Sequence, residues 1–290
     1  MTLQTPMRCS ALSESLGEPM IGSVDRRVRW LLVEDRSAWG TRAVRDVLGA
    51  ELEAEAKARK VRLQLVRRRE GDPAADAVRR VFLVDTEAHR MAVRSVTDLT
   101  EVPGLLDLPL ADFGAQLADP IFLVCTNGKR DACCALRGRA LVSALSDDHG
   151  ERTWECTHLG GHRFAGNLVC LPEGIVYGRV GAEDGPRLVD AYLDGRLDPA
   201  RLRGRSAWPQ PAQVAERALR LSHGLDRLDD LRLLEADIGD GHAAVVLGSP
   251  DGTRHRFDLR AGRAEPRFTS CRADERESPL MWTAVHASGA

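Results

Sequence analysis

Two apolar runs of strand length, each followed by a segment with helical spacing, constrain the fold of this chain most strongly. VRWLLVED begins at Val28 and precedes residues 41–60, which have helical spacing and good helix formers. PIFLVCT begins at Pro120 and precedes DACCALRGRALVSALSDD, in which Asp131 stands at a suitable N-cap position. Strands that alternate with helices predict an α/β fold, and the recurrence suggests an internal repeat of about 90 residues.

Shorter apolar runs predict further strands and one helix. The predicted strands are VRLQLV from Val61, RVFLVD from Arg80, RTWECT from Arg152, and the pair NLVCLP and IVYGRV around a turn at Glu173 and Gly174. A short helix is predicted for GPRLVDAYLDG, from Gly185.

Residues 206–290 read as a small α+β region of their own. A Pro-containing linker, AWPQPAQ, leads into the helical AERALRLSHGL, and strands are predicted at LRLLEADI, HAAVVLGS and RHRFDLR. The turn SPDGTRH joins the last two strands as a hairpin. This part of the sequence has no cluster of ligand-type residues, so we expect a packing or docking region.

Charge and hydropathy exclude two classes of partner. The 290 residues include 41 Lys and Arg against 43 Asp and Glu, so no electrostatic argument favours nucleic acid. No apolar run approaches the ~20 residues that span a bilayer, and the N-terminal MTLQTPMRCSALSES lacks the apolar segment of a secretory signal. We therefore expect a cytoplasmic protein that acts at neither a membrane nor a nucleic acid.

Seven cysteines in such a chain indicate metal or redox chemistry, because a reducing cytosol does not maintain disulfides. Four of them, Cys125, Cys133, Cys134 and Cys156, lie within one short part of the chain. Cys156 and Cys170 fall in apolar strands and are predicted to be ordinary buried thiols. Cys9 and Cys271 are too isolated in the sequence for a role to be assigned.

The stretch HLGGHRFAGN places His158 and His162 four residues apart with two glycines between them. Histidines at this spacing share a face of an α-helix, but Gly160 and Gly161 each cost about 1 kcal/mol relative to Ala in a helix. The stretch is therefore predicted to be a loop, in which the glycines permit positive φ and a close approach of the backbone to a bound group.

A second element, CTNGKRDACC, supplies thiols at the end of an apolar run and at the start of the segment that follows it. Cys125 ends a predicted strand, and Cys133 and Cys134 begin a helix whose N-terminal dipole favours thiolate. Two cysteines and two histidines can form a tetrahedral zinc site or hold a [2Fe–2S] cluster in which imidazoles replace two thiolates. Structural zinc usually takes cysteines two to four residues apart, which weighs against zinc.

CTNGKRDACC with HLGGHRFAGN, followed by LPEGIVYGRV, resembles the sucrase/ferredoxin-like family, and so do GEPMIGSV and WLLVEDRSAWG. The likeness covers roughly residues 9–205. It implies a thioredoxin-like ferredoxin fold that can comprise two thioredoxin-like halves. Carried over by position, the ligands of a [2Fe–2S] cluster are Cys125, Cys134, His158 and His162.

Two details of the ligand motif qualify this resemblance. Cys133 is the second candidate beside Cys134, because spacing alone does not separate them. Family members often have C-T-H-G where this chain has Asn127, so any role of that histidine is absent here.

The resemblance implies a thioredoxin-like half without ligands over 1–115 and a thioredoxin-like ferredoxin domain over 116–205. With the small α+β region over 206–290, we expect three regions. We expect an electron-transfer iron–sulfur protein that exchanges electrons with donor and acceptor proteins, and a redox carrier rather than a stand-alone enzyme. A zinc-stabilised Cys₂His₂ binding module without redox activity is the alternative. A thiol redox enzyme that uses Cys133 and Cys134 ranks last, because adjacent cysteines form a strained disulfide and C-x-x-C is missing.

Overall fold

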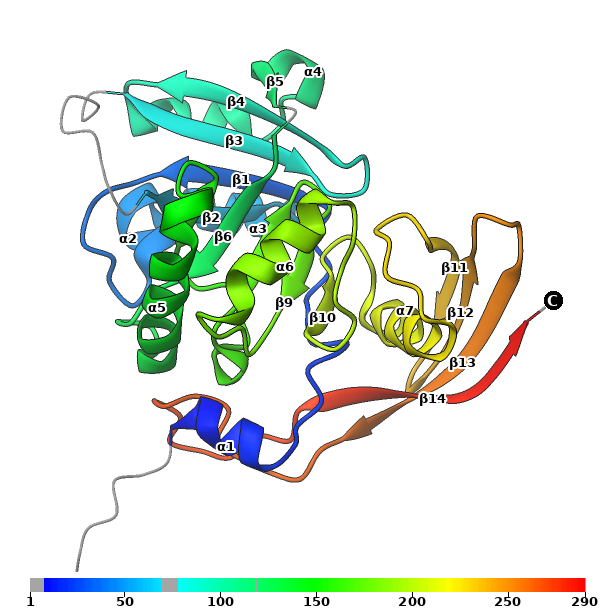
Figure 1. The fold of residues 1–290 in the computed structure, drawn as a ribbon. Helices are drawn as coiled ribbons and strands as arrows, with labels where there is room; N and C mark the ends of the chain where they lie inside the picture. The colour runs from blue at the N-terminus through cyan, green and yellow to red at the C-terminus, as the bar shows by residue number, and fades with distance from the viewer. Residues whose placement is uncertain (1–7, 69–77, 118, 290) are drawn as a thin grey trace, which may run out of the picture.

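A computed structural model describes residues 8–68, 78–117 and 119–289 of the chain. Most of the chain forms a mixed ten-stranded sheet with helices packed on it, and a smaller four-stranded sheet lies at one side (Figure 1). The predicted α/β fold is confirmed. The expectation that the N-terminal segment is no secretory signal rests partly on residues 1–7, which lie outside the described residues.

The large sheet has the strand order β10-β9-β8-β6-β7-β2-β1-β3-β4-β5. These strands are β1 (Arg29–Glu34), β2 (Arg62–Arg67), β3 (Arg79–Asp85), β4 (Arg90–Val96), β5 (Ala115–Leu117), β6 (Ile121–Cys125), β7 (Thr153–Cys156), β8 (Leu168–Leu171), β9 (Ile175–Tyr177) and β10 (Leu202–Arg205).

The two halves of this sheet repeat one arrangement of strands. β1 pairs parallel with β2 and antiparallel with β3, which pairs antiparallel with β4. β6 likewise pairs parallel with β7 and antiparallel with β8, which pairs antiparallel with β9. The equivalent strands β1 and β6 begin at Arg29 and Ile121, in agreement with a repeat of about 90 residues. The antiparallel pairing of β2 with β7 joins the halves, so the ranges 1–115 and 116–205 share one sheet.

Residues 41–60 form two helices rather than the single helix predicted for them. α2 (Ala43–Leu48) ends and α3 (Ala50–Ala58) begins at Gly49, whose φ of 89° is outside the helical region. Glycine adopts this conformation at little cost, so it ends one helix and starts the next at a new angle. The prediction of one continuous helix was therefore wrong at this residue.

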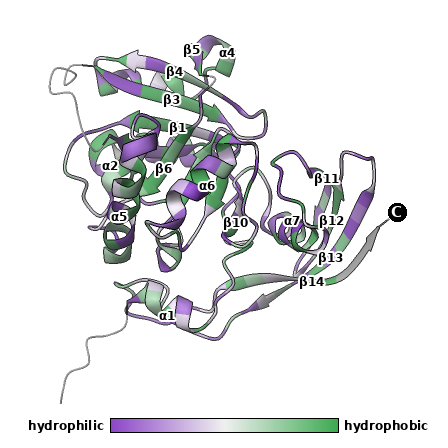
Figure 2. Cartoon of the chain, in the orientation of Figure 1, coloured by the Kyte–Doolittle hydropathy of each residue, from purple (hydrophilic) through white to green (hydrophobic). Residues whose placement is uncertain are grey.

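Helices α5 (Ala132–His149) and α6 (Asp184–Leu193) cover the second half of the sheet. Leu141 and Leu145 of α5 and Leu188 of α6 pack with Phe122 and Val124 of β6. The other residues of β6, including Leu123 and Cys125, belong to a core that also contains residues of β1, β2, β3 and β7. Because β6 is buried on both faces, its sequence is a continuous apolar run, seen as hydrophobic colouring in Figure 2.

The C-terminal region consists of α7 (Gln210–His223) on a four-stranded antiparallel sheet. The strands are β11 (Arg232–Ile238), β12 (His242–Gly248), β13 (Arg254–Arg263) and β14 (Leu280–Gly289). The predicted hairpin between β12 and β13 is present, whereas β14 had not been predicted and α7 starts inside the predicted linker. The remaining elements are α1 (Cys9–Ser15), α4 (Leu110–Phe113), and the 3-10 turns η2 (Leu99–Glu101), η3 (Pro103–Leu105) and η4 (His162–Phe164). None of the helices in the described part of the chain has the length and apolar character that crossing a membrane requires.

Candidate metal centre

The predicted ligands come from segments that meet at one edge of the large sheet. β6 and β7 are parallel, with Cys125 opposite Cys156 in register, so both strands end at this edge. Cys125 is the last residue of β6, and His158 follows the end of β7 by two residues. Side chains that leave parallel strands at their carboxyl ends converge, as they do in the ligand sites of other α/β proteins.

The turn between β6 and α5 orients the cysteines at the start of the helix. Asn127 is buried, its Oδ1 accepts from the Arg130 N–H, and its Nδ2 donates to the Gly40 carbonyl. Asp131 caps α5 by accepting from the Cys133 N–H at 2.9 Å, which confirms its predicted N-cap position. The asparagine that replaces the family histidine therefore holds the turn that precedes the cap.

Three of the four residues predicted as ligands form one close group, and His162 lies outside that group, against His158. The Sγ atoms of Cys125 and Cys134 and a ring nitrogen of His158 are all within 4.8 Å of one another. His162 Nδ1 is 3.4 Å from His158 Nε2, and the two rings are stacked with their centroids 5.0 Å apart. Both thiols are buried, and both imidazoles are half-buried.

The electrostatics of the thiol pair favour one thiolate. The hydrogen bond from Cys134, with a further one from His158, holds the pKa of the Cys125 thiol well below its usual range. The same hydrogen bond raises the pKa of Cys134, because that thiol retains the shared proton. Burial lowers the pKa of His162, which keeps its imidazole neutral. A thiolate and neutral imidazoles are the forms that bind metals.

The loop with the two histidines is held by guanidinium groups. Gly160 and Gly161 have φ values of 85° and 67°, as the loop interpretation predicted. The group closest to Gly161 is Arg203, whose guanidinium would lie 2.3 Å from an added Cβ. Arg203 donates to the Gly160 carbonyl, and Arg62 donates to the His158 carbonyl at 2.9 Å. The close approach that Gly161 permits is therefore to a buried side chain of the protein, whereas an added Cβ at Gly160 would meet nothing within 4 Å.

The donor set fits a metal or an iron–sulfur cluster. Nδ1 of His158 is buried, and no residue in the described ranges gives it a hydrogen bond. A buried polar atom without a partner is costly, and coordination to a metal would give this nitrogen a partner. Two thiols and two imidazoles match both a tetrahedral zinc site and a [2Fe–2S] centre with two histidine ligands.

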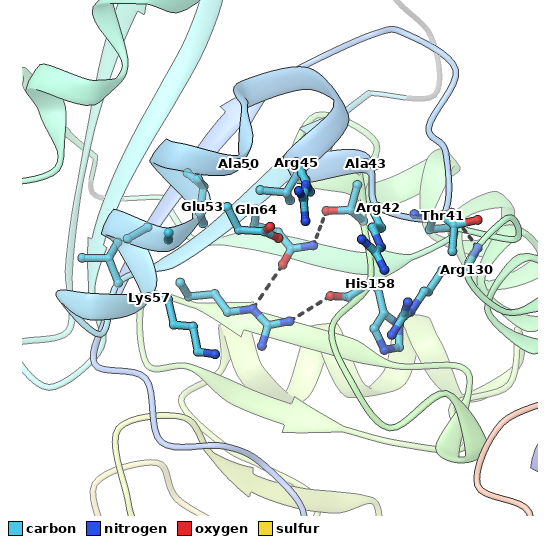
Figure 3. A pocket seen from close by; sticks show the side chains of 18 of the residues that line it. Thr41, Arg42, Ala43, Arg45, Ala50, Glu53, Lys57, Gln64, Arg130 and His158 are labelled. Atoms are coloured by element: carbon cyan, nitrogen blue, oxygen red, sulfur yellow. Dashed lines mark hydrogen bonds between the residues drawn. The ribbon is translucent and has the colours of Figure 1, made fainter. Parts of the chain in front are cut away.

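A basic pocket opens beside His158. Its volume is about 730 Å³, and it lies between the α2–α3 segment, β2 and the turn before α5. Figure 3 shows Arg42, Arg45, Lys57 and Arg130 around it, with His158 at its border. Its charged lining residues are Arg27, Arg42, Arg45, Glu53, Lys57, Arg62 and Arg130. This excess of cations suits an anionic partner surface or ligand.

Cys133 is directed to a different group of side chains from Cys134. Its Sγ lies with those of Cys9 and Cys271 and with the Asp131 carboxylate. Residues 206–290 thus supply one member, Cys271, to this group, and Cys9 and Cys271, to which the sequence assigned no role, are the residues that sequence reasoning missed. The only signal for them was the high cysteine number itself. Cys156 and Cys170 are buried in β7 and β8, as predicted.

The fold and this site define a class of protein: an α/β protein whose sheet repeats one strand arrangement and carries a thiol–imidazole ligand set at its edge. The chain belongs to the sucrase/ferredoxin-like family, whose model matches residues 20–204.

Two curated relatives are similar to part of the chain, and both are named Altered inheritance of mitochondria protein 32. The protein of Meyerozyma guilliermondii is 36% identical over 88 residues, which cover 27% of this chain and 31% of the relative. The protein of Eremothecium gossypii is 32% identical over 116 residues, which cover 31% of this chain and 37% of the relative. The chain thus spans about a third of the length of the curated relatives it matches. No solved structure gives a significant match.

Proposed function

We propose that this protein is an electron carrier that holds a [2Fe–2S] cluster with Cys125, Cys134, His158 and His162. The observation that carries the proposal is the meeting of two buried thiols and the His158 imidazole at the end of β6 and β7, with the His162 imidazole stacked on that of His158. Family membership supports the same function, because the motifs that carry the resemblance contain these four residues.

Bound between these side chains, the cluster would supply one-electron transfer. With two neutral imidazoles in place of thiolates, two ferric ions, two sulfides and two thiolates sum to zero charge, which favours acceptance of an electron. The chain itself keeps the cysteine side dry and leaves the histidine side half-exposed. Electron exchange with a partner protein is therefore expected through the imidazoles, where the basic pocket attracts an acidic surface.

A second candidate function is a zinc-stabilised binding module. The mutual separation of at most 4.8 Å among the two sulfurs and the His158 nitrogen fits a single tetrahedral ion. Such a site would be redox-inactive and would serve only to hold β6, α5 and the histidine loop together.

The deciding experiment measures iron, acid-labile sulfide and zinc in anaerobically purified protein, with a visible spectrum before and after dithionite. We expect two irons and two sulfides per chain, with absorption that bleaches on reduction. His158→Ala and His162→Ala should each lose iron, whereas His223→Ala, at an exposed histidine of α7, serves as the matched control and should retain it. A colourless protein whose zinc content falls in Cys125→Ser would contradict electron transfer and establish the zinc module.

A further inference from the structure

A second cluster of ligand-type side chains lies beside the first and involves other residues. It consists of Cys9, Asp131, Cys133 and Cys271. Cys9 begins α1, Asp131 and Cys133 start α5, and Cys271 belongs to the connection between β13 and β14. Figure 1 shows α1 next to this connection, although one is near the N-terminus and the other near the C-terminus.

The three sulfurs form a nearly equilateral triangle. The Sγ of Cys133 is 3.6 Å from that of Cys9 and 3.3 Å from that of Cys271, and the Cys9 and Cys271 sulfurs are 3.5 Å apart. Both carboxylate oxygens of Asp131 lie 3.8 Å from the Cys9 sulfur. With Zn–S bonds of about 2.3 Å, a tetrahedral ion spaces its sulfur ligands by about 3.8 Å. The triangle therefore has nearly the size that one zinc ion requires, with the carboxylate as fourth ligand.

Two other uses of three thiols fit this geometry less well. A disulfide joins only two sulfurs, at about 2.05 Å, and would leave the third thiol unused. The [2Fe–2S] centres of proteins take cysteine or histidine ligands, whereas the fourth residue of this set is the carboxylate of Asp131. A single metal ion would bind all three thiols and the Asp131 carboxylate.

Hydrogen bonds orient the ligands as they do around other metal sites. The Cys9 N–H donates to the Cys271 sulfur at 3.4 Å, and the Ser10 hydroxyl donates to the Cys133 sulfur at 3.3 Å. Asp131 accepts from the N–H groups of Cys133 and Cys271 and, at 3.1 Å, from the Ser270 hydroxyl. Such outer contacts stabilise thiolates and fix the direction of a carboxylate.

We propose that Cys9, Cys133, Cys271 and Asp131 bind one zinc ion at a structural site separate from the proposed cluster. Thiolates select soft metals, and a closed four-ligand set without a position for substrate is typical of structural zinc. The ion would join both terminal segments to the start of α5. The neighbouring Cys133 and Cys134 would then serve two different centres.

The test measures zinc, iron and sulfide in the full chain and in Cys271→Ser, Cys9→Ser and Cys125→Ser, with Cys170→Ala as a buried-cysteine control. We expect one zinc per chain that is lost in Cys271→Ser and Cys9→Ser while iron and sulfide stay unchanged. Cys125→Ser should retain this zinc and lose the iron and sulfide, so the two proposals fail separately. Cys271 is exposed, so its replacement should leave the fold intact, which circular dichroism checks.

Cobalt(II) added to zinc-free protein supplies a second measurement. Thiolate-to-cobalt charge-transfer absorption should appear in Cys125→Ser and be absent from the double variant Cys125→Ser/Cys271→Ser. The proposal is overturned if the wild type holds no zinc at this site, if zinc is unchanged in both Cys9→Ser and Cys271→Ser, or if intact mass shows two hydrogens lost to a disulfide among these cysteines.

Discussion

Arg62 and Arg203 place positive charge close to the Cys125 thiolate while their hydrogen bonds hold the histidine loop. Burial lowers the pKa of both groups, which shows the cost of keeping a guanidinium there. A thiolate nearby offsets part of this cost. The same positive charge would stabilise an added electron at the proposed cluster.

We expect Arg62→Gln to make the midpoint potential of the proposed cluster more negative. Loss of a charge interaction of about 1 kcal/mol corresponds to a shift on the order of 40 mV for one electron. Protein-film voltammetry measures the shift, and Arg62→Lys, which retains the charge, should stay close to wild type. Equal shifts in both variants would instead assign the effect to the hydrogen bond with the His158 carbonyl.

Glu173 lies in the turn between β8 and β9 and accepts a hydrogen bond from Tyr192. Burial raises its pKa above the ordinary value, so the folded protein holds this proton to higher pH than the unfolded chain does. Because the folded state then binds more protons, stability falls as pH rises from about 4.5 through the raised pKa.

We expect Glu173→Gln to remove this part of the pH dependence. Urea unfolding at a series of pH values between about 4 and 7 measures it, with the exposed Glu87→Gln as control. The prediction would be contradicted if the wild type and Glu173→Gln showed the same change of stability with pH.

At the level of secondary-structure elements, the site depends on how closely α5 approaches the end of β6. A Cβ on Gly138 would lie 2.1 Å from the Cys125 carbonyl oxygen, so only glycine fits at this crossing. The contact fixes the distance between the strand that carries Cys125 and the helix that carries Cys134.

We expect Gly138→Ala to push α5 away from β6, with a loss of about 1–3 kcal/mol in the free energy of unfolding and reduced iron content. Denaturant titration and iron analysis check both effects. Gly262→Ala in β13 is the control, because an added Cβ there meets nothing within 4 Å. Full iron content in Gly138→Ala would show that the ligand geometry tolerates a displaced helix.

For the whole molecule, the proposed zinc site links segments that are far apart in the chain. Residues 264–279 connect β13 to β14. The backbone bonds across this connection are those of the bridge between Arg267 and Glu277 and the one from the Ala264 N–H to the Pro279 carbonyl. Metal coordination at Cys271 would therefore contribute much of the order of this segment.

We expect a zinc chelator to increase the rate of proteolytic cleavage within residues 264–279 several-fold while the iron content stays constant. Limited proteolysis with mass analysis locates the cleavage. Cys271→Ser should be cleaved at the fast rate without chelator. A cleavage pattern that does not respond to zinc removal would argue against a structural role for the ion.

The sequence predicted the features that depend on residues close to one another in the chain. Apolar runs such as those of β1 and β6 identify buried strands, and the glycines between His158 and His162 exclude a helix, because these are local properties of the backbone and its side chains. The choice of Cys134 over Cys133 needed the family resemblance, since one residue along a helix changes the direction of the side chain by about 100°.

Sequence periodicity missed two features of the fold. β14 pairs with β13 across a long connection, and its sequence has a weak pattern. The helix predicted over 41–60 is divided at Gly49, where a single positive φ overrides good helix propensity on both sides.

By itself, the sequence determined the alternating elements and the local motifs that carry Cys125, Cys134, His158 and His162. Only the tertiary structure decided that β2 and β7 join two halves into one sheet, and that Cys9 meets Cys271 across 262 residues. Contacts at such separation leave no periodic trace in the sequence. They depend on how the whole chain packs, because burial of the sheet and its helices is what brings the two terminal segments to the start of α5.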